Sequence, residues 1–199
     1  MKSALVLFAV ASAISFSTLA QNSGGVKFGV NLVSQKYDAG SFGDNTITGT
    51  SFHIGLYGRY GIGTSAYFQP EIMYNSLKAS ENSEDITVNY ISVPLMFLYE
   101  FQQHVNIQAG PQLGFLISSD PDEIAEDDGF KKTDISFNFG IGADFNKVSI
   151  TARYCLGLTD IAGDELKDEF ESLLGEELTI KNNNFQISVG IRCFGGSAE

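Results

Sequence analysis

Tryptophan is absent from this sequence of 199 residues, and charged residues make up only 18% of it. Glycine and aromatic residues are abundant instead, with 21 Gly, 16 Phe and 8 Tyr. Aromatic side chains with few helix-favouring charges are typical of β-sheet. Basic residues are also scarce: 12 Lys and Arg stand against 24 Asp and Glu, for a net charge of −12. This excludes a nucleic-acid partner, which would require a basic surface.

A mostly apolar run occurs at the start of the chain. Residues 1–20, MKSALVLFAVASAISFSTLA, combine one early cation, an apolar stretch and a small-residue end, which is the pattern of a secretory signal peptide. The run is short for a membrane helix, and no basic stop-transfer segment follows it. We therefore expect cleavage before Gln21 and one exported domain over residues 21–199, a length that suits a single domain.

Strict alternation of apolar and other residues predicts eight strands in the mature chain. They are residues 26–32, 52–60, 66–75, 90–101, 105–117, 134–145, 148–158 and 184–194. The connections at 61–63, 102–103 and 146–147 are short, and those near 37–49, 78–85, 118–133 and 159–182 are predicted to be long loops. An even strand count with short turns at one end and long loops at the other predicts an up-and-down barrel.

Each predicted strand has one continuous apolar face, and its other face is rich in glycine with few charges. The charged residues of that second face are Lys27, Arg59, Glu71, Glu100, Asp144, Arg153 and Arg192. A soluble barrel points its apolar face inward and carries many charges outside, whereas a membrane barrel does the reverse. The sequence therefore predicts an all-β fold, an eight-stranded antiparallel transmembrane barrel in the outer membrane. Its termini and short turns would be periplasmic and its loops extracellular.

Proline interrupts one of these strands, YISVPLMFLYEF at 90–101. Pro94 falls on the interior face, and a closed barrel has no edge to accommodate it, so we expect a local bulge or a missing ladder bond. Tyr99 and Phe101 are expected in the interfacial girdle near the short turn. Pro70 and Pro111 fall on the lipid face of neighbouring strands, where the same irregularity is expected.

Several segments together carry a family resemblance. The segments AYFQPEIMYN, YISVPLMFLYEF, AGPQLGFLI, DISFNFGIGADF, ARYCLGLTDI and ISVGIRCF, in this order, resemble the porin-family outer-membrane β-barrel domain of Bacteroidetes-type bacteria. The resemblance covers the whole mature chain. It implies an eight-stranded barrel of the same architecture as OmpX and the OmpA membrane domain, with no defined catalytic residues.

Catalysis on lipids is one alternative, because some small outer-membrane barrels are enzymes. His53 has Ser51 nearby, and Asp134 or Glu71 could face the same lumen, but a triad needs hydrogen-bond geometry that sequence does not give. We expect His53 to be a hydrogen-bonded interior residue and His104 a solvated residue beside a turn. No catalytic residue and no cofactor is assigned.

A narrow channel is a second alternative. Eight strands leave room only for side chains, whereas open aqueous channels need about 16 strands. Buried charges must be paired, so we expect Arg59, Arg153, Arg192 and Lys27 to pair with Glu71, Glu100 and Asp144. The sequence thus predicts a closed interior.

The loops hold most of the acidity. DPDEIAEDDG at 120–129 offers carboxylates to divalent cations but lacks the calcium-loop spacing, so a solvated acidic loop is expected and no metal ligand is assigned. Residues 164–178, DELKDEFESLLGEEL, predict a short helix that caps the barrel, with partner binding as the alternative. Cys155 falls on the interior and Cys193 on the lipid face, too far apart to bridge, which predicts two free thiols.

These patterns predict a structural or surface-interaction role, such as membrane integrity, adhesion or binding by the loops, without catalysis. The expected partners are outer-membrane lipid and lipopolysaccharide, the barrel-assembly machinery during insertion, and a surface partner of the acidic loops.

Overall fold

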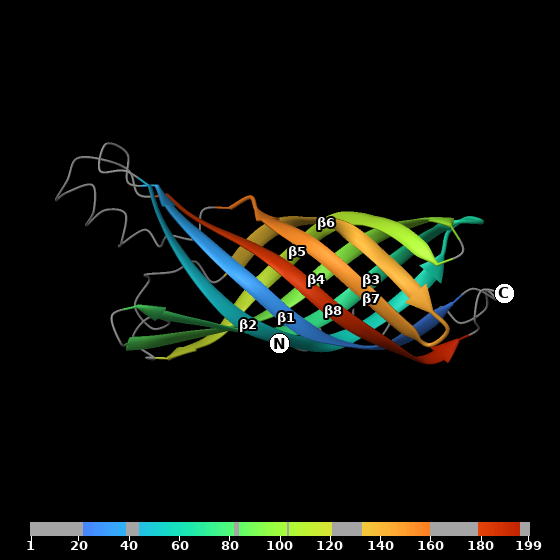
Figure 1. Cartoon of the computed structure of the whole chain (residues 1–199), viewed down its shortest axis with the longest axis horizontal. Helices are drawn as coiled ribbons and strands as arrows, with labels where there is room; N and C mark the ends of the chain where they lie inside the picture. The colour runs from blue at the N-terminus through green and yellow to red at the C-terminus, as the bar shows by residue number, and fades with distance from the viewer. Residues whose placement is uncertain are drawn as a thin grey trace, which may run out of the picture.

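The computed structural model describes residues 22–38, 44–81, 84–102, 104–120, 133–159 and 179–195. These residues form eight antiparallel strands that close into one barrel, each strand pairing with its neighbours in the sequence and β1 pairing with β8 (Figure 1). The strands are β1 Ser23–Asp38, β2 Asp44–Gly61, β3 Ala66–Glu81, β4 Glu84–Gln102, β5 Val105–Asp120, β6 Thr133–Phe145, β7 Val148–Gly157 and β8 Thr179–Gly195. The predicted fold class is confirmed.

Short connections lie at one end of the barrel, at residues 62–65, 103–104 and 146–147. The last is a two-residue hairpin in which Asn146 has φ 54°, a left-handed conformation that asparagine tolerates better than most residues. The start of β1 and the end of β8 lie together, since Ser23 pairs with Gly195, and the N–H of Arg192 donates to the carbonyl of Lys147 in the β6–β7 turn. Both ends of the described barrel therefore lie at the short-turn end.

The barrel is apolar outside and polar inside. Leu56 and Ile141 are about 60% exposed on the outer face (61% and 59%), while Lys27, Glu71 and Arg153 are each 2% exposed in the interior. Large apolar side chains surround the barrel on every strand, and only hydrocarbon solvent makes such a surface favourable. The predicted orientation of the two faces is confirmed. In the described part of the chain, no helix is long and apolar enough to cross a membrane.

Two of the four predicted long loops are wrong. Residues 37–49 and 78–85 are mostly strand, because β1 and β2 pair out to Asp38 and Asp44, and β3 and β4 pair out to Glu81 and Glu84. The prediction ended each strand where its apolar face ended. Backbone pairing continues past that point, since a hairpin ladder needs no lipid and its polar residues include β-favouring threonines such as Thr46 and Thr48.

Pro94 is buried in the barrel interior, as predicted. The ladder between β3 and β4 pairs Pro70 with Leu95 and resumes at Met73 with Ser92, so pairing is interrupted opposite Pro94. The register on either side is the same, which means that the proline causes a missing ladder pairing and no bulge. Pro111 is exposed on the outer face, and Tyr99 and Phe101 are more than half exposed there.

The two cysteines lie on opposite faces. Cys155 is fully buried in the interior and Cys193 is exposed near the end of β8, and both are free thiols, as predicted.

Candidate functional site

Glu71 of β3 is the centre of an ionic cluster in the barrel interior. Its Oε1 lies 2.6 Å from Lys27 Nζ on β1 and 2.6 Å from Arg153 Nη2 on β7. Arg153 Nη1 also donates to Oε2 at 2.8 Å, so the guanidinium binds the carboxylate through both nitrogens. One buried carboxylate is thus shared by two buried cations from different strands.

Hydrogen bonds extend this cluster into a closed ring across the lumen. Arg153 Nε donates to Gln108, whose amide donates to Asn106, and Asn106 donates to Asp144 at 2.9 Å. Arg59 binds Asp144 at 3.0 Å and donates from Nε to Gln69 at 2.7 Å, and Gln69 donates back to Glu71 at 2.6 Å. We call these seven residues the interior ring: Arg59, Gln69, Glu71, Asn106, Gln108, Asp144 and Arg153.

The interior ring joins five strands through side chains alone, because its members come from β2, β3, β5, β6 and β7. It crosses the lumen with paired charges, which is how buried charges become tolerable. The predicted pairing of Lys27, Arg59 and Arg153 with Glu71 and Asp144 is confirmed. The carboxylate of Glu100 instead accepts a hydrogen bond from the hydroxyl of Tyr67.

A second polar chain centres on His53 of β2. His53 Nε2 lies 2.8 Å from Ser188 Oγ on β8, and Nδ1 lies 2.8 Å from Asn31 Oδ1 on β1. Asn31 Nδ2 in turn donates to Ser51 Oγ at 2.9 Å. The order hydroxyl, imidazole, amide is that of a nucleophile, a base and an orienting group. All three members are almost fully buried, with exposed fractions of 2% for Ser188 and His53 and 1% for Asn31.

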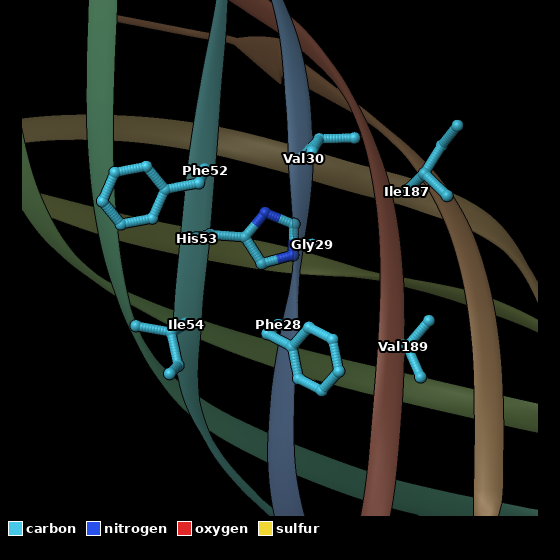
Figure 2. Close-up of a pocket in the computed structure, with 8 residues that line it drawn as sticks. All are labelled: Phe28, Gly29, Val30, Phe52, His53, Ile54, Ile187 and Val189. Carbon is cyan, nitrogen blue, oxygen red and sulfur yellow. The ribbon is translucent and has the colours of Figure 1, made fainter.

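Gly29 allows His53 to reach Ser188. In the register of the barrel, Gly29 pairs with His53 on one side and with Ser188 on the other, so the imidazole crosses β1 at this residue (Figure 2). A Cβ at Gly29 would lie 2.8 Å from both His53 Cε1 and Nε2 and closer still to the Ile187 carbonyl oxygen. Any larger residue would therefore push the imidazole away from Ser188.

The catalytic set considered from the sequence is not assembled. Ser51 accepts a hydrogen bond from Asn31, Glu71 belongs to the interior ring, and Asp134 accepts a hydrogen bond from Thr159. His53 is a hydrogen-bonded interior residue, as predicted, and His104 is exposed beside its turn, where it stacks on Phe145. Ser188 and Asn31 were missed because only the strand register brings them to the imidazole.

Some of the remaining predictions lie outside the described residues. This applies to the acidic segment beyond Asp120, to the helix at 164–178 and to the signal peptide at 1–20. Within the ranges that the structure describes, no group of three or more His, Cys, Asp or Glu side chains is placed to hold a metal ion.

Solved structures of small outer-membrane barrels share this fold. Neisserial surface protein A (NspA) superposes with a TM-score of 0.53 at 15% identity, covering 85% of this chain and 97% of that one. Ail, the attachment invasion locus protein of Yersinia pestis, gives 0.52 at 13% identity and covers 87% and 99%. Ail solved with the heparin analogue sucrose octasulfate gives 0.51 at 14% identity, covering 86% and 99%. At these identities the likeness concerns the fold.

Sequence comparison assigns the family. No curated protein matches the chain. The family model described as outer membrane protein beta-barrel domain matches residues 19–163, most of the chain. Together with the inverted faces of the barrel, this match identifies an integral protein of the outer membrane. The chain belongs to the outer membrane protein beta-barrel domain family.

Proposed function

We propose that this barrel acts as a structural anchor for a surface that interacts at its loop end, in adhesion, in loop-mediated binding or in membrane integrity. The observation that carries this proposal is the interior ring, which spans five strands and crosses the lumen with hydrogen-bonded side chains. A filled barrel provides no path for solutes. The residues that contact a partner would then lie in the loops, which is where functional residues concentrate on rigid scaffolds.

The small barrels of similar fold support the same type of role. Ail is named for attachment and invasion and has been solved with a heparin analogue, and NspA is named as a surface protein. A protein that binds sulfated glycans needs basic residues, whereas the loop sequences of this chain are acidic. Residues 121–132 and 160–178 are dominated by Asp and Glu, so we propose a basic or cation-bridged partner, including lipopolysaccharide phosphates bridged by divalent ions.

The orientation follows from the same proposal. The loop end faces the exterior, and the short-turn end, with both ends of the described barrel, faces the periplasm. Residues 1–20 are removed on export as a signal peptide, and the barrel-assembly machinery inserts residues 21–199 as one domain.

Adhesion of Gram-negative cells that display the barrel tests the proposal. Neutralising the loop carboxylates Asp122, Glu123, Glu126, Asp127 and Asp128 to Asn and Gln should lower adhesion to polylysine-coated and epithelial surfaces toward the level of cells without the barrel. A matched control neutralises Lys131 and Lys132 in the same segment and should retain adhesion. Resistance to bile salts, which are detergents, measures membrane integrity. If barrel-bearing and barrel-free cells adhere equally and resist bile salts equally, the proposal fails.

Planar-bilayer recording separates this role from that of a narrow channel. The wild-type barrel should give no discrete conductance steps, because the interior ring occupies the lumen with side chains from five strands. Replacing Gln108, Asn106 and Gln69 together by alanine should produce small steps, since these residues fill the lumen without carrying its charge. Frequent steps from the wild type at neutral pH would contradict a closed interior.

Lipid acyl hydrolysis is the second candidate function, and one observation favours it. Ser188, His53 and Asn31 have the distances of a hydrolase triad, at 2.8 Å for each contact. Their burial argues against it, because a carbonyl carbon has to reach Ser188 Oγ and this serine is 2% exposed. This geometry best supports a structural role for His53, whose hydrogen bonds tie β1, β2 and β8 together.

A further inference from the structure

An apolar groove crosses three strands on the outer face of the barrel, directly over the row that contains His53. It has a volume of about 580 Å³. Figure 2 shows its lining residues, which come from β1, β2 and β8. They are Phe28, Gly29, Val30, Phe52, His53, Ile54, Ile187 and Val189.

The strand register explains the shape of the groove. One wall is the cross-strand row Phe52, Val30 and Ile187, and the other is the row Ile54, Phe28 and Val189. Between these two rows lies the row His53, Gly29 and Ser188, whose side chains are absent or turned to the interior. The floor of the groove is therefore backbone, and its walls are aliphatic and aromatic.

The groove lies deep in the apolar belt. On β1 the outward residues Phe28, Val30 and Leu32 are all about half exposed, and Phe28 and Val30 are central to the strand. Lipid headgroups lie at the rims of a belt about 25 Å tall, so the groove faces hydrocarbon.

The dimensions of the groove select a thin occupant. Its walls are two residues apart along each strand, about 7 Å between Cα positions, whereas a helix with its side chains is about 10–12 Å wide. A second barrel would also need a far larger contact than eight residues, since stable interfaces use about 20–30 residues a side. If a methylene group is given about 30 Å³, the share of one water molecule in the liquid, the groove holds roughly 15–20 methylenes.

We propose that the groove binds one acyl chain of a membrane lipid and holds it across β1, β2 and β8. The groove is part of the apolar outer face that the barrel already presents to the bilayer. Its floor is secured from the inside by the hydrogen bonds of His53 to Ser188 and Asn31, which tie the same three strands together.

Native mass spectrometry of the full mature barrel tests this proposal. The barrel is folded into vesicles of phosphatidylethanolamine and phosphatidylglycerol and released with increasing detergent. The variant Ile54→Phe/Ile187→Phe enlarges one residue in each wall and narrows the groove. The matched control, Ile107→Phe/Ile141→Phe, makes the same change at a cross-strand pair on the outer face of β5 and β6.

Wild type and control should retain one lipid per barrel after other lipids are removed. The fraction of barrels that carry one lipid should be at least five-fold lower for the groove variant. Equal retention by all three proteins would overturn the proposal, as would a two-barrel species that the groove variant alone loses. Folding is checked by the mobility shift on heating. If the double variant does not fold, Val30→Phe narrows the same groove from its centre and is compared with Ile107→Phe.

Discussion

Replacing Glu71 by glutamine should be among the most destabilising changes of equal side-chain size in this barrel, at about 3–5 kcal/mol, because removing one partner of a buried ion pair leaves its counterions uncompensated. Lys27 and Arg153 both bind this carboxylate, and all three side chains are at most 3% exposed. The variant would keep one amide oxygen as an acceptor but would turn its N–H₂ group toward Arg153, which binds both carboxylate oxygens of Glu71. Urea unfolding in lipid vesicles, followed by the mobility shift on heating, measures the loss.

Lys27→Met is the matched control for this experiment. It removes one of the two cations and leaves Arg153 bound to both carboxylate oxygens, so the free energy of unfolding should change by no more than about 1 kcal/mol. Both variants remove the ion pair between Lys27 and Glu71, but only Glu71→Gln leaves two buried cations without a carboxylate. If both variants lost equal stability, the excess positive charge in the cluster would not be the cause.

The alternation of side chains was sufficient to predict the barrel. Each predicted strand shows one face that suits hydrocarbon, and the pairing of neighbours in sequence order follows from the short turns. The prediction that charged residues such as Arg153 and Glu71 meet inside was also correct, because a narrow barrel offers no other place for them. These conclusions needed only the period of the pattern and the number of strands.

The strand ends and the contacts of His53 could not be predicted in this way. Strands β3 and β4 pair to Glu81 and Glu84, beyond the apolar face that the sequence pattern detects. His53 binds Ser188, which is 135 positions away in the chain, across a glycine on the strand between them. Such a contact depends on the register of three strands, and a one-residue shift would turn Ser188 to the lipid.

The same dependence on register applies to the lipid-facing groove. Its two walls and its floor are successive cross-strand rows of one patch, and each row combines residues from three strands. No single strand sequence contains the groove. It arises because Gly29 lies between two outward residues, and its paired neighbours His53 and Ser188 both turn inward.

Arginine at Ile141 should cost about 2–4 kcal/mol of unfolding free energy. Ile141 lies on the outer face of β6, four residues before the end of the strand at Phe145, which places it near the middle of the apolar belt. A guanidinium there must remain in hydrocarbon or pull water and headgroups toward it, and that cost depends on depth in the bilayer. Urea unfolding of Ile141→Arg and wild type in the same vesicles measures the difference.

Ile62→Arg is the control that makes this result specific to a membrane. Ile62 and Ile141 are equally exposed, at 60% and 59%, so solvent exposure alone predicts the same effect for both substitutions. Ile62 lies in the short turn between β2 and β3, at the rim of the barrel, where the same substitution should cost only about 0–1 kcal/mol. A large difference between these two equally exposed sites would show that Ile141 lies deep in the bilayer and Ile62 lies at its surface. If both variants were as stable as wild type in vesicles, the outer face of β6 would be in water and the barrel would not span the bilayer at this depth.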